Sequence, residues 1–183
     1  CTPTLFPATL GLHPHVIDTV IDVGANEGQY RDFLRLEVGY TGRVVSFEPV
    51  PELAAKLKDR ATRDPQWIVH ARALGAAAGV RSINVTSDPV FSSFRTLRPE
   101  ESFSGRNIVI RHEHVPVSTL DREFSDVRAL RRTYVKLDTQ GFDLEVLRGG
   151  AGVVSVVPAL QTEISFRPIY EKVPNYAEAI QAF

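Results

Sequence analysis

Two glycines separated by three residues follow a short apolar stretch near the start of the chain, in the order Gly24-Ala25-Asn26-Glu27-Gly28. Glycine at the end of a strand lets the backbone approach a ligand closely, because no side chain stands in the way. Asp22 lies in the apolar stretch and offers a carboxylate to a ligand ammonium group. These residues predict a strand, a ligand-binding turn and a helix; the alternative is a tight turn that binds nothing.

The glycine turn differs from two common nucleotide-binding loops. A dinucleotide fingerprint reads G-x-G-x-x-G, and its second glycine lets the pyrophosphate touch the backbone. Asn26 stands at that position, which argues against NAD or FAD. No Gly-Lys-Ser/Thr sequence follows, so a Walker P-loop is excluded. A ligand with an amino-acid end fits Gly24, Ala25, Asn26 and Gly28 better than one that presents a pyrophosphate.

A second acidic residue, Glu48, ends the apolar run 43–47 at about 20 residues beyond the turn. In doubly wound folds an acid at this separation accepts hydrogen bonds from ribose hydroxyls. A carboxylate can accept both hydrogen bonds of a vicinal diol, and its charge strengthens them. A strand-end glutamate alone is commonly only solvated. Together with the glycine turn, Glu48 predicts binding of an adenosine-like group.

Two further carboxylates lie at the ends of later apolar runs. Asp138 ends the run 134–138, and Glu163 lies near the end of 159–164. Asp138 can hold a ligand ammonium or act as a general base, and its alternative role is an N-cap for a helix over 142–147. Glu163 has either a catalytic or metal-binding role or a place in a structural salt bridge.

Composition places the chain among ordinary globular proteins. Its 183 residues are 43% hydrophobic and 23% charged, which is typical of one domain with a sizeable core. Lys and Arg (21) nearly balance Asp and Glu (22), so the overall charge does not favour nucleic acid or an anionic membrane. The single cysteine, Cys1, excludes an internal disulfide.

Other sequence signals bear on location and metals. No apolar run approaches the ~20 residues of a membrane span, and the first residues lack a basic signal region. We therefore expect a cytoplasmic protein with no membrane partner. The sequence has no tight cluster of His and Asp ligands, so no metal is expected.

Apolar periodicity predicts strands that alternate with amphipathic helices. Strands are expected over 20–24, 43–48, 67–73, 107–117, 134–138 and 159–164, and helices over 30–38, 51–63 and 142–147, from about 119 and from 176. Residues 81–86 alternate as an antiparallel or edge strand does. This order predicts an α/β fold: a Rossmann-like, doubly wound, mostly parallel sheet with helices on both faces. Strand-end residues should then face one cleft.

Residues 87–107 interrupt this pattern with serines, arginines and scattered apolar residues. Such a segment is a candidate for a mobile loop or lid over a site. The arginines within 95–111 can recognise an acidic substrate such as a nucleotide sugar. Solvation is the more common role for such residues, and we favour it for most of them.

Four stretches together carry a family resemblance. They are Val20-Ile21-Asp22-Val23-Gly24-Ala25-Asn26-Glu27-Gly28, Phe47-Glu48-Pro49, Lys136-Leu137-Asp138-Thr139-Gln140-Gly141-Phe142-Asp143-Leu144-Glu145-Val146-Leu147-Arg148-Gly149 and Gln161-Thr162-Glu163. They resemble the FkbM family of S-adenosylmethionine-dependent methyltransferases, with the block 138–149 as the family-specific part. The similarity begins near residue 18, so we expect a lead segment over 1–17 and a cofactor-binding domain over 18–183.

The resemblance implies a class I methyltransferase fold with a seven-stranded sheet. It also implies that the glycine turn passes beneath the methionine end of S-adenosylmethionine and that Glu48 binds the ribose. Residues Arg72, Ala73 and Leu74 would flank the adenine, and Asp138 would lie beside the methyl donor. The sequence ends in the helix that contains Tyr176, before the last two strands that the resemblance implies.

The function expected is O-methylation of a hydroxylated small molecule such as a sugar or a secondary metabolite. Methyl transfer depends strongly on positioning of the acceptor. An acceptor hydroxyl must also lose a proton, and the candidate bases are Asp138, Glu163, His112 and His114. The alternatives are an NAD(P)-linked oxidoreductase, which Asn26 disfavours, and a non-catalytic nucleotide-binding module. The substrate itself and the oligomeric state are not predicted.

Overall fold

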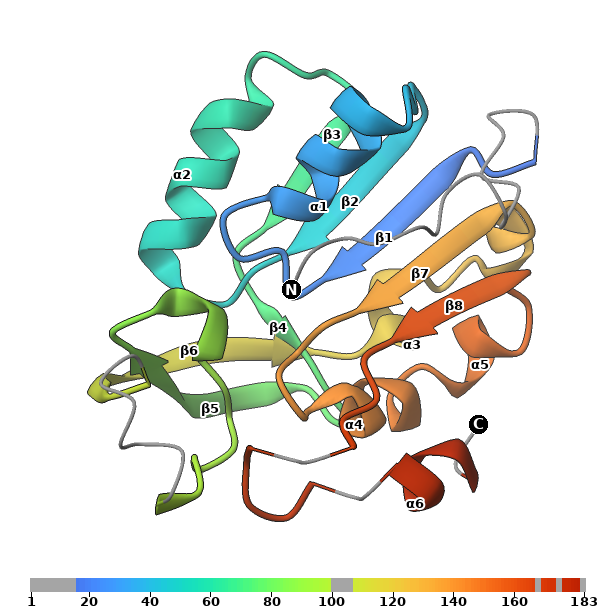
Figure 1. The fold of residues 1–183 in the computed structure, drawn as a ribbon. Coiled ribbons are helices and arrows are strands. Elements are labelled where there is room, and N and C mark those ends of the chain that lie inside the picture. The colour runs from blue at the N-terminus through green and yellow to red at the C-terminus, as the bar shows by residue number, and fades with distance from the viewer. Residues whose placement is uncertain (1–15, 100–106, 167–168, 174–175, 182–183) are drawn as a thin grey trace.

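Five parallel strands form the main sheet, in the order β3-β2-β1-β7-β8 (Figure 1). A computed structural model describes residues 16–99, 107–166, 169–173 and 176–181. The strands are β1 (Thr19–Val23), β2 (Arg43–Phe47), β3 (Trp67–His70), β7 (Thr133–Leu137) and β8 (Ala159–Thr162). The chain runs outward from β1 to β3 and then returns to β7 on the other side of β1. The strand order thus reverses between β1 and β7, which is where ligands bind in such sheets.

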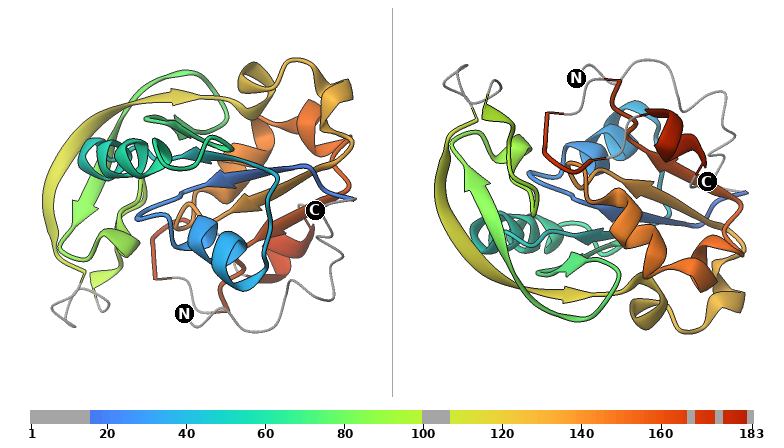
Figure 2. Two further views of the ribbon diagram at one scale, coloured as in Figure 1. Left: turned by 90° about the horizontal axis from the view of Figure 1, so that it is seen from above. Right: turned by 90° about the horizontal axis from the view of Figure 1, so that it is seen from below.

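Helices cover both faces of this sheet because its strands are apolar on both sides. Val20 packs with Leu34, Leu57 and Trp67 on one face, whereas Ile21 packs with Val146 on the other. The first face is covered by α1 (Gln29–Asp32), the π-helical η1 (Phe33–Glu37) and α2 (Pro51–Ala61); the second by α3 (Leu120–Glu123), η4 (Val127–Leu130), α4 (Asp143–Arg148) and α5 (Ala151–Val154). Figure 2 shows α1 and the α4–α5 segment on opposite sides. The predicted doubly wound α/β fold is confirmed.

A second sheet of three strands, in the order β4-β6-β5, lies beside the main one. Its strands are β4 (Ala73–Leu74), β5 (Gly79–Thr86) and β6 (Val109–Ser118), and β5 runs antiparallel to β6 as expected for 81–86. Ile83 and Val115 pack against Leu53 of α2. The short 3-10 turn η2 (Pro89–Phe91) follows β5.

The expected continuous strand over 67–73 is wrong. Strand β3 ends at His70, and the amide of Arg72 donates to the carbonyl of His70, which turns the chain sharply. Ala73 and Leu74 then pair with Val117 and Ser118 in the second sheet. The apolar periodicity of the sequence does not predict that the chain leaves the main sheet here and joins the second one.

The main sheet of the described residues has fewer strands than the resemblance implies. Where seven strands were expected, the described residues form a main sheet of five strands, and α6 (Tyr176–Gln181) follows. The expected lead segment falls mostly on residues 1–15, which lie outside the described residues. None of the described helices has the length and apolar character needed to cross a membrane.

Candidate functional site

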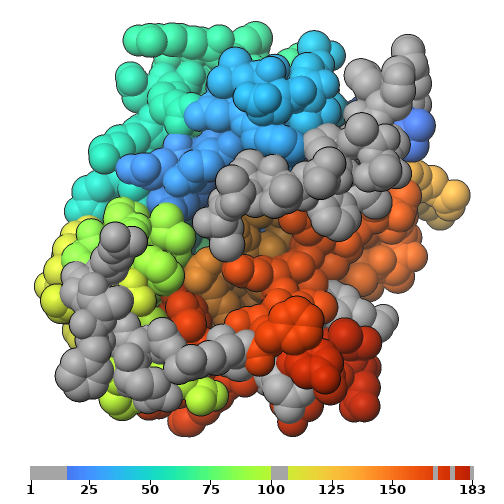
Figure 3. Space-filling view, viewed as in Figure 1, coloured from blue at the N-terminus to red at the C-terminus, as the bar shows by residue number. Residues whose placement is uncertain are grey.

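A cavity of about 630 Å³ lies at the carboxyl ends of β1, β2, β7 and β8, where the strand order reverses. Its volume lies within the range of small-molecule and cofactor sites. Figure 3 shows this face of the molecule hollowed near its centre, between the segments coloured blue, yellow-green and orange. The sequence-predicted residues that line it are Gly24, Ala25, Asn26, Glu48, Ala73, Leu74, Asp138 and Glu163.

The turn after β1 is built by backbone that only glycine adopts easily. Gly24 has φ +84°, and a Cβ placed on it would lie 2.0 Å from the carbonyl oxygen of Asp138. Gly28 has φ +86° and faces Leu57 and Trp67, outside the cavity lining. The first glycine therefore lets the β1 and β7 turns meet, while the second positions α1. Both are explained by conformation and packing.

Glu48 is 4% exposed, and its carboxylate bonds to the glycine turn that follows β1. One of its carboxylate oxygens accepts from the amide of Asn26 at 2.7 Å, and the other accepts from the amide of Val50 at 2.8 Å. Burial raises the pKa of Glu48 to about 7, although both amide hydrogen bonds oppose the shift. The carboxylate is thus fixed between two strand ends and lines the cavity.

Apolar residues surround this end of the cavity. Ala73 and Leu74 line it together with Val50, Ile83 and Phe94. Arg72, expected to flank the adenine, instead forms an ion pair with Glu123 at 3.0 Å and is absent from the lining. A flat apolar group next to a hydrogen-bonding carboxylate fits this end.

Asp22 has a different position from the one expected. It is fully buried in β1, one residue before the strand ends, and does not line the cavity. Its Oδ1 lies 3.3 Å from Nζ of Lys136, on the neighbouring strand, so its partner is an ammonium of the protein itself. The sequence analysis missed Lys136, which lines the cavity and also lies 3.3 Å from Asp138. The available signal was its place two residues before Asp138, on the same side of the strand.

Asp138 and Glu163 meet at the open side of the cavity. Oδ1 of Asp138 accepts from Nε2 of Gln140 at 2.9 Å, and the Glu163 carboxyl group is close enough to Asp138 for the two to interact electrostatically. Partial burial raises the pKa of Glu163, and the negative charges of Asp138 and Asp143 add to this rise. A carboxyl group with a raised pKa is suited to accepting a proton near neutral pH.

The capping role considered for Asp138 is wrong. Helix α4 begins at Asp143, and Phe142 occupies the N-cap position without a side-chain hydrogen bond. Asp143, which the sequence analysis missed, accepts from the amide of Thr139 at 2.8 Å and from the hydroxyl of Thr162 at 3.1 Å. It fixes the turn after β7, and its burial raises its pKa.

The two histidines considered as bases lie apart from this site. His112 is paired with the side chain of Asn84 at 2.9 Å on the second sheet, and neither His112 nor His114 lines the cavity. Within the described part of the chain, no three His, Cys, Asp or Glu residues are grouped so that they could hold a metal ion.

The comparison with protein families identifies the domain. Residues 22–183 match the family described as methyltransferase FkbM domain. The chain belongs to the FkbM methyltransferase family. Among solved structures, methyltransferase FkbM from Methylobacillus flagellatus KT is similar, with 18% identity and a TM-score of 0.49. That likeness covers 76% of this chain and 30% of that protein's chain, so the present chain corresponds to less than a third of its length. A comparison with curated proteins gives no match.

In this FkbM-family domain, the first part of the segment expected to form a mobile loop or lid lines the cavity. Pro89, Val90, Ser92, Ser93 and Phe94 line it. The hydroxyl of Ser93 donates to the carbonyl of Gln140 at 2.7 Å, which ties the segment to the β7 turn. Residues 100–106 of the predicted lid lie outside the described residues.

The described arginines of the 95–111 region have partners within the chain. Arg95 donates to the carbonyl of Gly141, and Arg98 to that of Tyr170. Arg111 forms ion pairs with Glu52 and Glu113. Neither Arg95, Arg98 nor Arg111 lines the cavity. Arg106 lies outside the described residues.

Proposed function

We propose that this FkbM-family domain binds S-adenosylmethionine in the cavity and methylates a hydroxyl group of a small molecule such as a sugar or a secondary metabolite. One observation carries the proposal: the buried Glu48 carboxylate, held by two backbone amides, lies between the Gly24 turn and the apolar Ala73 region of one cavity. In S-adenosylmethionine the ribose diol likewise lies between an amino-acid end and a flat base. The Gly24 turn, Glu48 and the Ala73 region would match these three parts in turn.

The residues present fit each part of such a ligand. Glu48 would accept the ribose hydroxyls, and Ala73 and Leu74 would contact the adenine. The turn formed by Gly24, Ala25 and Asn26 would lie along the methionine end, and the side-chain oxygen of Asn26 is buried without a protein partner among the described residues. Asp138 would bind the α-ammonium group. When bound, S-adenosylmethionine supplies an electrophilic methyl group.

The chain's own contribution to the reaction is positioning and proton transfer. Asp138 is ion-paired with Lys136, whereas Glu163 next to it has a raised pKa. Two neighbouring carboxyl groups in such different surroundings take different roles. Glu163 would accept the proton of the acceptor hydroxyl, and Asp138 would bind the α-ammonium group of the cofactor. Tyr134 and Gln161 line the same side of the cavity and would orient the acceptor by hydrogen bonds.

Calorimetric titration with S-adenosylhomocysteine, S-adenosylmethionine and NAD tests the cofactor assignment. We expect saturable binding of both sulfur ligands and none of NAD. Glu48→Ala should weaken S-adenosylhomocysteine binding by about 1–3 kcal/mol, since a charged hydrogen-bond acceptor is lost. Glu52, an exposed acid on α2, provides the matched control, and Glu52→Ala should leave the affinity for S-adenosylhomocysteine unchanged. Binding of NAD without either sulfur ligand would contradict the proposal and favour an oxidoreductase.

Transfer of a labelled methyl group to a panel of hydroxylated compounds tests the reaction. Glu163→Gln should reduce turnover by at least about 10²-fold, the usual contribution of a general base, while cofactor affinity stays close to that of the wild type. Cofactor binding without transfer to any hydroxyl compound would favour the non-catalytic module instead.

A further inference from the structure

Lys136 is a buried ammonium group between two carboxylates. The residue is 8% exposed, and Nζ lies 3.3 Å from Oδ1 of Asp22 and 3.3 Å from Oδ2 of Asp138. The register of the parallel strands places Asp22 directly beside Lys136, and alternation along β7 places Asp138 on the same side. Both contacts therefore follow from the fold. Burial opposes the charge of Lys136, but the two aspartates outweigh it and raise its pKa.

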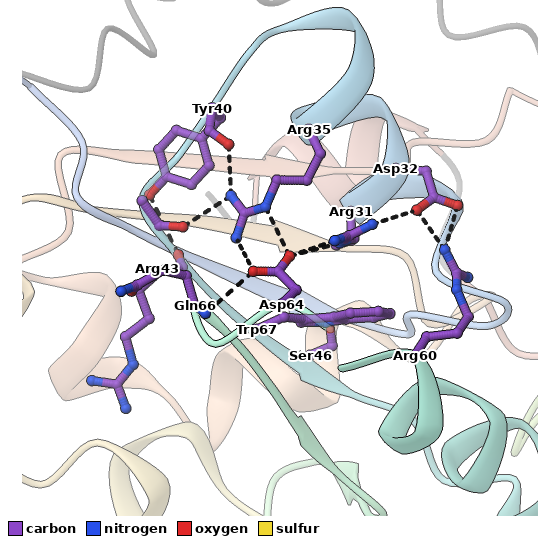
Figure 4. Close-up of polar contacts among 11 residues, drawn as sticks. Arg31, Asp32, Arg35, Tyr40, Arg43, Ser46, Arg60, Asp64, Gln66 and Trp67 are labelled. Atoms are coloured by element: carbon purple, nitrogen blue, oxygen red, sulfur yellow. Dashed lines mark hydrogen bonds and ion pairs between the residues drawn. The ribbon is translucent and has the colours of Figure 1, made fainter. Parts of the chain in front are cut away.

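A chain of hydrogen bonds anchors the inner partner of this lysine. The hydroxyl of Ser46 donates to Oδ2 of Asp22 at 3.3 Å, and Nε1 of Trp67 donates to the oxygen of Ser46 at 3.0 Å. The guanidinium groups of Arg31 and Arg60 lie 4.9 and 5.4 Å from the centre of the Trp67 ring (Figure 4). Asp22 is thus held between Ser46 on β2 and Lys136 on β7, and it does not itself line the cavity.

Charge balance shows what this arrangement does for a ligand. An unpaired ammonium in the cavity would repel a ligand that carries a positive charge. Asp22 compensates Lys136, so the group of three charges retains one net negative charge, and Asp138 presents it at the cavity wall. S-adenosylmethionine carries a sulfonium and an α-ammonium group, which need such a negative charge.

We propose that Lys136 is a positioning residue that holds the Asp138 carboxylate toward the methionine end of the cofactor, with Asp22 as its buried counter-charge. This assignment rests on the proposed function. It gives Asp22 an indirect role in cofactor binding, through Lys136, in place of the direct contact that its position in the strand excludes.

The double variant Asp22→Asn/Lys136→Met tests positioning without leaving a buried charge unpaired. Removing the pair as a unit avoids the destabilisation that follows when one partner is lost. We expect a thermal midpoint close to that of the wild type and S-adenosylhomocysteine affinity lower by about tenfold, since Asp138 loses its anchor. Tyr40→Phe, whose hydroxyl donates to the carbonyl of Arg43 far from the cavity, is the control. A folded double variant that binds like the wild type would overturn the assignment.

The single variant Asp22→Asn tests the charge balance. It leaves the ammonium of Lys136 uncompensated, so S-adenosylmethionine, with its additional sulfonium charge, should lose several-fold more affinity than S-adenosylhomocysteine. A merely structural defect would weaken both ligands equally, and equal losses would contradict the charge-balancing role.

A readout without cofactor separates this assignment from the proposed function. Lys136 lowers the pKa of Glu163, against the larger effects that raise it, so Lys136→Met and the double variant should raise the titration midpoint of the Glu163 carboxyl carbon in NMR. An unchanged midpoint would show that the charge of Lys136 does not affect Glu163 beside Asp138. That result would contradict the assignment, whether or not the protein binds the cofactor. Failure of the wild type to bind S-adenosylhomocysteine would contradict the proposed function alone, if the midpoint moves as expected.

Discussion

Two charged clusters in this domain contain similar residue types but differ in how their charges are paired. The surface cluster consists of Arg31, Asp32, Arg35, Arg60 and Asp64 around Trp67 (Figure 4), and the cavity cluster consists of Asp22, Glu48, Lys136, Asp138 and Glu163. In the surface cluster, Asp64 accepts hydrogen bonds from both Arg31 and Arg35, and Arg60 binds both oxygens of Asp32. In the cavity cluster, one lysine stands among four carboxyl groups and forms ion pairs with two of them, Asp22 and Asp138.

The difference appears in the direction of the pKa shifts. Burial opposes ionisation of Asp64, but the hydrogen bonds from Arg35 and Arg31 outweigh it and lower its pKa. Burial raises the pKa of Glu48, and partial burial together with neighbouring carboxylates raises that of Glu163. The first cluster is electrostatically satisfied by the protein, whereas the second is not. An excess of poorly compensated acid around a cavity is the pattern of a binding site.

The cavity cluster depends most on the close approach of two turns. Gly24→Ala would drive a Cβ against the carbonyl oxygen of Asp138 and would also strain a backbone with φ +84°. We expect the free energy of unfolding to fall by about 4 kcal/mol, measured by urea denaturation.

Gly39→Ala is the matched control for this change. Gly39 has φ +68°, but nothing lies within 4 Å of the added Cβ, so only the backbone strain of about 1–2 kcal/mol remains. Equal losses in the two variants would show that the contact between the turns is unimportant.

Substitutions in the surface cluster should lower the stability of the fold and leave cofactor affinity unchanged. Asp64→Ala leaves Arg31 and Arg35 without their shared partner, and we expect a loss of ~3 kcal/mol in the free energy of unfolding. Because the pKa of Asp64 is lowered on folding, this contribution is present above the unfolded pKa of about 3.9 and disappears as the pH falls through the folded value. Asp59→Ala, an exposed acid on α2, should change stability by less than about 0.5 kcal/mol.

The raised pKa of Glu48 predicts pH-dependent cofactor binding. In the proposed role of Glu48, ribose hydroxyls would donate to the ionised carboxylate, so affinity for S-adenosylhomocysteine should rise between about pH 6 and about pH 8 and then level off. For stability the sign is opposite, since a pKa raised on folding favours the fold at low pH and this benefit is lost as the pH rises through about 7.

Glu48→Gln tests this prediction, because it removes the titrating group but keeps its shape. It should weaken binding by about 1–2 kcal/mol at pH 8 and flatten the pH dependence. A pH dependence that persists in this variant would assign the effect to another group, such as Glu163.

The sequence predicted the elements of the main sheet well because their signals are local. The apolar runs, the glycine turn and the acids at strand ends each occupy a few adjacent residues, and a doubly wound sheet brings them together in a known way. Glu48, Asp138 and the Gly24 turn accordingly lie around one cavity. The roles of these residues remain proposals.

The wrong predictions concern features that depend on contacts between segments far apart in the sequence. The sequence cannot show that Asp22 pairs with Lys136 and does not line the cavity, because a buried strand has ligand-facing and protein-facing sides that look alike. The break between His70 and Ala73 is of the same kind, since Ala73 pairs with a strand that comes much later in the chain. The helix start is a further case, since Phe142 occupies the N-cap position and the Asp143 carboxylate accepts hydrogen bonds from Thr139 and Thr162, contacts that depend on the folded turn and on β8.

The distinction between the two clusters can be tested directly by calorimetric titration of S-adenosylhomocysteine into two isosteric variants, Asp138→Asn and Asp64→Asn, with thermal midpoints measured on the same samples. We predict that Asp138→Asn weakens binding by about tenfold with an unchanged midpoint. Asp64→Asn should lower the midpoint by about 5 °C and keep the wild-type affinity. A folded Asp64→Asn protein that loses affinity, or an Asp138→Asn protein that binds like the wild type, would contradict the assignment of the cavity cluster to the cofactor.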